Sequence, residues 1–293
     1  MIVALAASLA VAAGLLIAVK AHSHPRARRS VAAAPRPTPH PRQLPTQLPT
    51  QRSTQRSTDT PTASTAPDLP RYSTVGALFS AGVGARHGCT ASVIASTTRN
   101  TVITAAHCVH DDAKGMQFVP AYRNGRTTEG IWQVTGAYVL PAWLRYHDPA
   151  ADYAVLTVAP HVTGGRTVQL AEVTGAETLG ASVPPGTKVT VVAYNAGRDD
   201  APIACRATVY VLRKYPTFDC HGFVNGSSGS PWLTLDAHGH ATIHGVIGGL
   251  DQGGCREYRS HSATFDSAVD ILVRRAEAGA RPDVPDRPRP PNC

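Results

Sequence analysis

Cysteine and acidic side chains are scarce in the N-terminal part of this 293-residue sequence. The first 88 residues contain no cysteine, and residues 20–70 contain only two acidic side chains against eight Lys and Arg. This segment accounts for a net charge of +6 out of the +8 of the whole chain, whereas residues 71–275 carry only +2. The basic charge is therefore no argument for a nucleic-acid-binding fold, and we expect no nucleic acid partner.

Residues 2–19 form an uncharged apolar run that no basic residue precedes. The run is long enough for a membrane-crossing helix and also for the core of a signal peptide. Basic residues follow it instead, which reverses the usual signal-peptide order, and cleavage after Ala21 fits the small-x-small rule poorly. A cleaved signal, an uncleaved anchor and a misassigned start codon all stay open. We predict a secreted or extracytoplasmic protein, with residues 1–21 as its signal peptide or membrane anchor.

Residues 22–70 are rich in Pro, Thr, Ser, Gln and Arg and contain four tandem tetrads that begin at Gln43. Such a segment cannot bury enough apolar surface to offset its ordering entropy, so we predict a disordered linker. Its positive charge allows association with anionic cell-wall polymer or a membrane surface. A simple solvated tether is the alternative.

The rest of the chain reads as short β-strands separated by turn residues. The predicted strands are Val75–Phe79, Thr90–Ile94, Thr101–Thr104, Met116–Val119, Trp132–Leu140, Tyr153–Val158, Lys188–Tyr194, Ala207–Leu212 and Ala241–Ile247. Many are β-branched and follow a period of two, which indicates an all-β barrel or sandwich. The clearest helix is Ser267–Glu277, with apolar residues three and four apart. We place the domain at residues 71–275 and a Pro-rich C-terminal tail at residues 276–293.

A Ser between two glycines, in Gly226-Ser227-Ser228-Gly229, is the first candidate for chemistry. Glycine leaves backbone amides uncovered, and acyl transfer needs a hydroxyl nucleophile beside N–H donors that stabilise an oxyanion. Gly-rich Ser stretches also occur in plain loops, so the chain must supply a base as well.

Two further candidates lie upstream, each beside an apolar run. His107 follows the strand pattern that ends at Thr104, and Asp152 precedes Tyr-Ala-Val-Leu. A lone His or Asp at such places is usually structural, and Asp148 competes with Asp152. However, Asp148 precedes a proline and reads as a turn residue. The residues follow one another in the order His107, Asp152, Ser228, as in the chymotrypsin arrangement. Lipases and esterases have a different order, Ser before Asp before His, which is absent here.

These motifs resemble those of chymotrypsin/trypsin-type serine proteases. Thr104–Cys108 reads T-A-A-H-C as in the family, Asp152–Leu156 reads D-x-A-x-L, and Gly226–Pro231 replaces the family's G-D-S-G-G-P with G-S-S-G-S-P. The resemblance covers about residues 71–275 and is strongest to the secreted bacterial branch that includes glutamyl endopeptidases. It implies two six-stranded antiparallel β-barrels of chymotrypsin type, a short C-terminal helix, and a division near residues 160–185.

The resemblance also implies roles for individual residues. Ser228 would be the nucleophile, His107 the base and Asp152 its orienting group, with the backbone amides of Gly226 and Ser228 as the oxyanion hole. It further implies an endopeptidase that acts as a monomer on protein or peptide substrates without a cofactor. A non-catalytic binding module at the cell surface is the alternative.

Six cysteines in an exported chain predict disulfides. Six allow 15 pairings, and the resemblance implies the pair Cys89 with Cys108. Cys205 and Cys220 flank a second pair of strands and form our second pair. Cys255 is then left with Cys293. A metal is not expected, because the cluster His238, His240 and His244 matches no zinc template and reads as a hairpin turn.

Two departures from the family concern activation and specificity. Trypsin-type enzymes carry an Asp immediately before the nucleophile, and this Asp pairs with the new N-terminal amine that activation creates. This chain has Ser227 at that position. We therefore expect the loop around Gly226 to be ordered by other contacts, namely the bridge at Cys220 and the packing of Trp232. No Asp stands where trypsin binds Arg or Lys, and Ile247 occupies the place of the glutamyl endopeptidases' His, so neither preference is supported.

Overall fold

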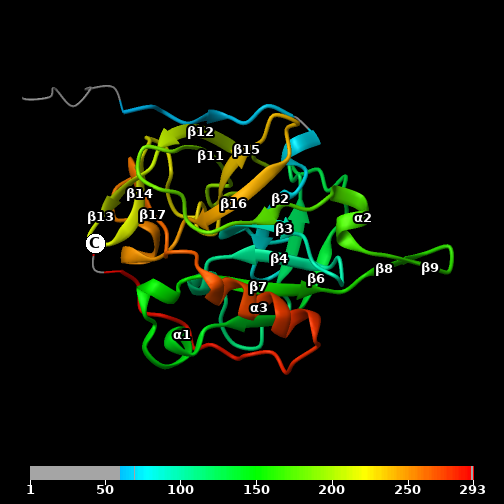
Figure 1. Ribbon diagram of the computed structural model, residues 1–293. Coiled ribbons are helices and arrows are strands. Elements are labelled where there is room, and N and C mark those ends of the chain that lie inside the picture. The colour runs from blue at the N-terminus through cyan, green and yellow to red at the C-terminus, as the bar shows by residue number, and fades with distance from the viewer. Residues whose placement is uncertain (1–59, 69, 292) are drawn as a thin grey trace, which may run out of the picture. The chain divides into compact units, whose positions relative to one another are not determined.

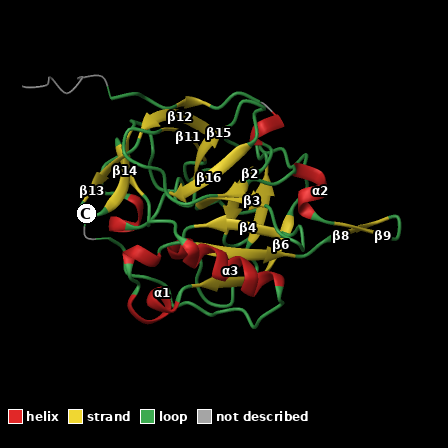
Figure 2. Ribbon diagram, viewed as in Figure 1, coloured by secondary structure: helices red, strands yellow, loops and turns green. Residues whose placement is uncertain are grey.

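The computed structural model describes residues 60–68, 70–291 and 293 (Figure 1). All of them belong to one unit of the chain, which is built mostly of strands with a few short helices at its periphery (Figure 2). The apolar run at residues 2–19 and most of the predicted linker lie outside the described residues. No helix in the described ranges is long and apolar enough to span a membrane.

Six antiparallel strands of the first half close into a barrel in the order β2-β3-β4-β7-β6-β5. They are β2 Val75–Phe79, β3 Cys89–Ile94, β4 Thr101–Thr104, β5 Gln117–Pro120, β6 Trp132–Val139 and β7 Ala154–Val158. Apolar side chains at alternate positions fill the interior, including the fully buried Val93, Val102, Phe118 and Leu156. The first of the two expected barrels is thus confirmed.

Among the described residues the second half forms two sheets and no closed barrel, so the second of the two expected barrels is not confirmed. This half contains a six-stranded sheet in the order β1-β12-β11-β15-β16-β10 and a separate three-stranded sheet in the order β13-β14-β17. The first sheet consists of β1 Ser64–Thr65, β10 Thr178–Leu179, β11 Lys188–Ala193, β12 Ile203–Thr208, β15 Pro231–Leu235 and β16 Ala241–Val246. The second consists of β13 Tyr210–Leu212, β14 Tyr215–Asp219 and β17 Arg259–His261.

Two local features mark the start and the end of β12. The outer edge of β12 is occupied at its start by β1, where Ser64 pairs with Ala204. After β12, the buried Val209 donates its N–H to the carbonyl of Thr187, which extends the pairing with β11 by one residue, and β13 begins at the next residue. Strands β12 and β13 therefore follow one another almost directly in the chain but belong to two different sheets.

The start of the folded unit also differs from the predicted boundary at residue 70. Strand β1 lies within the segment predicted as linker, and Ala66 after it is almost fully buried. The backbone of Ala63 donates to His221 O, and that of Ala66 donates to Pro202 O. The sheet therefore begins at Ser64, before residue 70, and the linker prediction is wrong for this strand and for Ala66.

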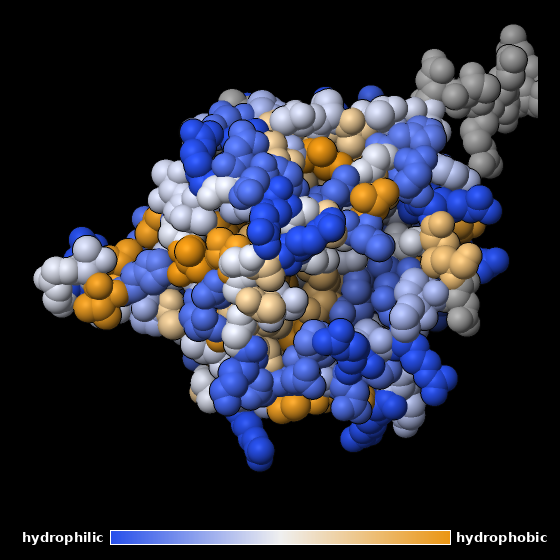
Figure 3. All heavy atoms as spheres, turned by 180° about the vertical axis from the view of Figure 1, so that it is seen from behind, coloured by the Kyte–Doolittle hydropathy of each residue, from blue (hydrophilic) through white to orange (hydrophobic). Residues whose placement is uncertain are grey.

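The connection between the halves carries structure of its own. The hairpin of β8 His161–Thr163 and β9 Arg166–Val168 projects from the body and is seen in Figure 3 at the left. The imidazole of His161 stacks on Trp132 with ring centroids 3.8 Å apart, which fixes the base of the hairpin. Helix α2 Leu170–Thr174 and strand β10 follow and lead into the second half.

The predicted helix is present with the predicted bounds as α3 Ser267–Glu277. The side chain of Asp266 accepts the N–H of Ala268 and so caps its first turn. Its apolar face, which includes Val269, Leu272 and Ala276, packs over β7 (Figure 1). A second short helix, α1 Pro141–Tyr146, is not apparent in the sequence pattern.

The C-terminal tail is bound along the molecule after α3. Arg275 and Asp283 form a bidentate ion pair, in which Nη2 lies 2.8 Å from Oδ1 and Nη1 lies 2.9 Å from Oδ2. Further along, Pro285 O accepts the N–H of Asp111, and Cys293 forms a disulfide with Cys255. The tail therefore contacts both halves.

Candidate active site

His107 and Asp152 are neighbours because the strands that carry them are neighbours. Strands β4 and β7 are antiparallel, with Thr104 opposite Ala154. His107 lies in the 3-10 helix Ala106–Cys108 just after β4, and Asp152 lies just before β7. The end of one strand and the start of the other thus bring both side chains to the same end of the barrel.

Asp152 is fully buried and accepts hydrogen bonds at both carboxylate oxygens. The imidazole of His107 lies with Nδ1 2.8 Å from Oδ2 and 3.1 Å from Oδ1. The backbone N–H of His107 donates to Oδ1 at 2.9 Å, and that of Gly249 donates to Oδ2 at 2.8 Å. A buried carboxylate that accepts this many hydrogen bonds is held in one orientation. Because it can only accept, it also fixes the imidazole with a proton on Nδ1, so that Nε2 is free to accept a proton.

Asp148 has a different role. Its side chain accepts the N–H of Ala150 at 2.9 Å and caps the 3-10 helix Pro149–Ala151. The interpretation of Asp148 as a turn residue is confirmed.

The loop that carries Ser228 depends on its two glycines. Gly226 and Gly229 have φ angles of +99° and +84°, where a side chain causes strain. A Cβ on Gly226 would lie 2.0 Å from the backbone nitrogen of Ala196, and one on Gly229 would lie 2.1 Å from Thr90 O. Any other residue at either position would push the loop away from the segments beneath it.

Two backbone amides of this loop have no acceptor among the described residues, namely those of Gly226 and Ser228. The amides that alternate with them are bonded: Ser227 N–H donates to Val224 O at 3.0 Å, and Gly229 N–H donates to Ile247 O at 2.8 Å. This alternation leaves two amides free to bind a negatively charged oxygen together.

Ser228 and His107 line the same cleft, which has a volume of about 310 Å³. Gly226, Cys89 and Cys108 also line it, so it lies between the first half and the second. In this structure neither His107 Nε2 nor Ser228 Oγ hydrogen-bonds to another described residue. Hydrogen bonds between a nucleophile and its base often form fully only in the substrate complex.

A larger cavity of about 680 Å³ also borders Ser228 and adjoins this cleft. Its charged lining comprises the guanidinium groups of Arg86, Arg256 and Arg259 and the carboxylate of Glu257, with no Asp among the described lining residues. Ile247 also lines it, at the place where the resemblance called for a His. This lining fits the expectation that Arg or Lys side chains are not favoured there.

An ion pair lies beside this cavity. Arg259 donates from Nε to Asp219 Oδ1 at 2.8 Å and from Nη2 to Oδ2 at 3.2 Å, and the hydroxyl of Tyr210 also donates to Asp219. The hydrogen bond to the carboxylate raises the pKa of Arg259 above its ordinary value. Burial, with the hydrogen bond to Asp219, raises the pKa of Tyr210 to about 12. Arg259 is therefore permanently charged.

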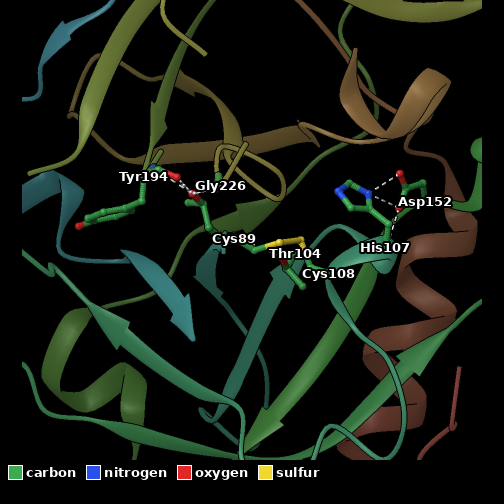
Figure 4. Close-up of a disulfide and its surroundings, with 8 residues drawn as sticks. Cys89, Thr104, His107, Cys108, Asp152, Tyr194 and Gly226 are labelled. Atoms are coloured by element: carbon green, nitrogen blue, oxygen red, sulfur yellow. Dashed lines mark hydrogen bonds and ion pairs between the residues drawn. A yellow bond between two sulfur atoms is a disulfide. The ribbon is translucent and has the colours of Figure 1, made fainter. Parts of the chain in front are cut away.

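The structure contains three disulfides, and they join the same cysteines as the predicted pairs: Cys89–Cys108, Cys205–Cys220 and Cys255–Cys293. The first joins the start of β3 to the short helix that carries His107, as Figure 4 shows. It therefore restrains His107 against the barrel.

The contacts that order the loop around Gly226 differ from those expected. Cys220 and Trp232 are buried in the core of the second half, where Trp232 packs against Phe218 with ring centroids 5.0 Å apart. The hydrogen bonds to the loop's carbonyls come instead from Thr90 and Ala196, and from Ser230 within the loop. Sequence reasoning missed Thr90, although it follows the cysteine expected to pair beside His107.

The hairpin histidines form no evident ligand set. His240 pairs with Asp236 at 3.1 Å on the surface, and His244 contacts Thr234 and Ala181 instead. In the described ranges, no group of three His, Cys, Asp or Glu side chains could hold a metal ion.

Sequence comparison finds one family. The model of the trypsin-like peptidase domain matches residues 89–241, which include His107, Asp152 and Ser228. A search of curated proteins finds no match.

Solved structures with a similar fold are numerous. The protease Anisep from Arthrobacter nicotinovorans has a TM-score of 0.59 at 20% identity, covering 72% of this chain and 98% of its own. A Glu endopeptidase has a TM-score of 0.54 at 17% identity, covering 74% and 97%. Human heparin binding protein has a TM-score of 0.52 at 16% identity, covering 79% and 99%. At these identities the likeness concerns the fold.

Proposed function

Because the chain belongs to the trypsin-like peptidase family, we propose that it is an exported serine endopeptidase that uses His107, Asp152 and Ser228 as a catalytic triad. One observation carries the proposal: the buried carboxylate of Asp152 holds an imidazole that shares a cleft with Ser228. A single-chain site of this kind needs no cofactor.

The proposed reaction begins with attack of Ser228 Oγ on the carbonyl carbon of a peptide bond. His107 Nε2 takes the hydroxyl proton, and Asp152 stabilises the imidazolium through Nδ1. The free amides of Gly226 and Ser228 donate to the oxyanion of the tetrahedral intermediate. The intermediate collapses to an acyl-enzyme as His107 returns the proton to the leaving amine. Water then attacks the ester with the same base, releasing the acid and restoring Ser228.

The substrates we propose are proteins or peptides that lie across the cleft between the halves. The large cavity beside Ser228 would receive a side chain of the substrate. The three disulfides support an oxidising, extracytoplasmic location. The basic segment at residues 20–70 is our candidate for association with a cell wall or membrane surface.

A non-catalytic binding module is the second candidate, because human heparin binding protein has a similar fold. Binding alone requires neither an imidazole fixed by a buried carboxylate nor a pair of uncommitted amides in the same cleft. Since the described residues include both beside Ser228, the catalytic proposal accounts for more of the observations.

A fluorophosphonate probe tests the proposal directly. We expect the wild-type protein to be labelled at Ser228 in a peptide map, and His107→Ala to lose nearly all labelling while remaining folded. A peptide-library digest would then define the preferred side chains. A folded wild-type protein that neither labels at Ser228 nor hydrolyses any peptide would favour the binding module.

A further inference from the structure

Thr90 lies at the junction between the first barrel and the loop that carries Ser228. It is the second residue of β3, next to Cys89, and it is completely buried. Figure 4 shows the region around it: the Cys89–Cys108 disulfide, Gly226 and Tyr194 lie close together on the side away from Asp152. Most buried hydroxyls are hydrogen-bonded, so the partners of this one show what it holds.

The side chain of Thr90 binds two backbone groups from separate segments of the second half. Its Oγ1 accepts the N–H of Tyr194 at 2.9 Å and donates to Gly226 O at 3.0 Å, with Tyr194 O as a more distant acceptor at 3.5 Å. A hydroxyl has one proton and two lone pairs, so this arrangement uses its donor fully. Valine has the same shape but could satisfy neither partner.

The backbone of Thr90 binds the same loop. Its N–H donates to Ser228 O at 2.8 Å, and its carbonyl accepts the hydroxyl of Thr104 at 2.7 Å. Gly229 lies so close to this carbonyl that it has no room for a side chain. Thr90 therefore contacts the loop on both sides of Ser228.

The peptide planes of the loop show why this matters. In a trans peptide, a carbonyl that is held in place fixes the N–H of the next residue in the opposite direction. The planes with the free amides of Gly226 and Ser228 have their carbonyls held by Ala196 and Ser230. Thr90 holds the carbonyls of the two planes that alternate with them.

We propose that Thr90 is a positioning residue for the nucleophile: its hydroxyl fixes the Gly226–Ser227 peptide and thereby the direction of the two free amides on either side. This inference rests on the proposed function, since the amides serve as an oxyanion hole only if Ser228 is the nucleophile. Thr90 itself does not line the cleft and touches no reacting atom.

The position of Thr90 also links the two parts of the site. Cys89 next to it is bonded to Cys108, which follows His107. One end of β3 therefore holds the base through a disulfide and the nucleophile through hydrogen bonds. The proposed site is assembled from segments of both halves, and this strand end fixes their spacing.

Three variants of Thr90 separate the hydroxyl from the shape of the side chain. Thr90→Val keeps the shape and removes the hydroxyl, Thr90→Ser keeps the hydroxyl, and Thr90→Ala removes both. We expect Thr90→Val and Thr90→Ala to lower kcat by about 10-fold to 100-fold, with KM changed less than about threefold, because small misplacements of reacting groups cost this much. Thr90→Ser should stay within about threefold of wild type.

The matched control is Thr101→Val, which removes an equally buried threonine hydroxyl from β4, where it bonds to Ser96. It should cost comparable stability in thermal unfolding but leave kcat unchanged. A loss of kcat as large in Thr101→Val, a failure of Thr90→Ser to preserve activity, or a loss that lies wholly in KM would overturn the proposal.

Amide hydrogen exchange tests the same inference without any activity. The Ser227 amide shares its peptide plane with the Gly226 carbonyl that Thr90 holds, so it should exchange at least 10-fold faster in Thr90→Val than in Thr90→Ser. The amide of Val93, which is bonded to Thr74 O within the barrel, should be unchanged. Equal exchange at Ser227 in both variants would contradict the role of Thr90. Absence of labelling at Ser228 in wild type would contradict only the proposed function.

Discussion

At the scale of single residues, the site depends on atoms that can only accept hydrogen bonds. Asp152 receives three N–H groups and donates none. A side-chain amide at this position would have one accepting oxygen, and its NH₂ group would face donors. The carboxylate is therefore required for its two acceptors as well as for its charge.

The first prediction concerns this carboxylate. Asp152→Asn should lower kcat by about 10⁴-fold, because an amide proton that points at His107 Nδ1 selects the tautomer whose Nε2 cannot accept a proton. Steady-state hydrolysis of a peptide substrate measures the effect. The control is Asp148→Asn, a nearby acid that caps a 3-10 helix, which should stay close to wild type. Similar losses in the two variants would remove Asp152 from its proposed role.

Site residues could be predicted from the sequence only where they lie in or beside a recognisable local motif. His107, Asp152 and Ser228 each adjoin a short motif, and their order along the chain singles out one arrangement. Thr90 has no such motif, because its partner Gly226 is 136 residues away and is a backbone carbonyl. Contacts of side chains with distant backbone groups leave no pattern in the sequence.

At the scale of the elements, the bridge that joins β3 to the helix of His107 gives the second prediction. Replacing both Cys89 and Cys108 by Ala should cost about 3 kcal/mol in unfolding free energy, from the entropy of a closed loop of this length. The Cys205–Cys220 bridge closes a loop of similar size, with a sequence separation of 15 residues against 19 for Cys89–Cys108, so the same change at its cysteines is the matched control. Denaturant unfolding should therefore give comparable losses for the two double variants.

Activity should distinguish these two bridges. Only the first restrains His107, so kcat of the folded protein should fall at least 10-fold in the Cys89, Cys108 double variant and less than about threefold in the other. Equal kcat values in the two folded variants would show that the barrel alone holds His107 in place.

Strand β17 gives a prediction about pH. Burial lowers the pKa of His261, which lies against Thr217 with Nδ1 2.9 Å from Oγ1. The unfolded chain then binds a proton more readily than the folded one, so stability decreases as the pH falls below about 6.5 toward the lower folded-state pKa. His261→Gln should flatten the dependence of unfolding free energy on pH by at most about 1.4 kcal/mol per pH unit. Equal slopes in wild type and His261→Gln would refute the assignment.

Element boundaries were predictable where the signal is local and failed where tertiary pairing decides. Strand β4 and helix α3 have the predicted bounds, because a β-branched run and an amphipathic spacing mark them. The predicted strand at residues 207–212 is divided at Val209 into the end of β12, which pairs with β11, and β13, which pairs with β14. The pairing of β1 likewise depends on the free edge of β12, which lies far away in the sequence and leaves no local pattern around β1.

At the scale of the whole molecule, the two halves are joined by more than the connection between them. The tail after α3 contacts the first half and ends in a disulfide with the second. Thr90 and Gly226 bond directly across the division. The site therefore lies where the halves are held together, so the geometry of the nucleophile loop depends on the fold as a whole.

The last prediction follows from how this loop is held. In trypsin-type activation, a new N-terminal amine inserts beside an Asp and orders the loop that forms the oxyanion hole. Ser227 has no charge to receive such an amine, and burying an unpaired ammonium would cost several kcal/mol. Here all four carbonyls from Asn225 to Ser228 are already bonded, to Ala196, Thr90 and Ser230. We expect the site to be active without any cleavage.

The test compares two forms of the protein that both retain β1, because the sheet begins before residue 70. One form begins at residue 60, and the other carries a removable extension ahead of it. Equal kcat/KM before and after clean removal of the extension is the expected result. A hundredfold rise on removal would show that insertion of an N-terminus orders the loop. In that case the hydrogen bonds from Thr90 and Ala196 would be a consequence of activation and not its substitute.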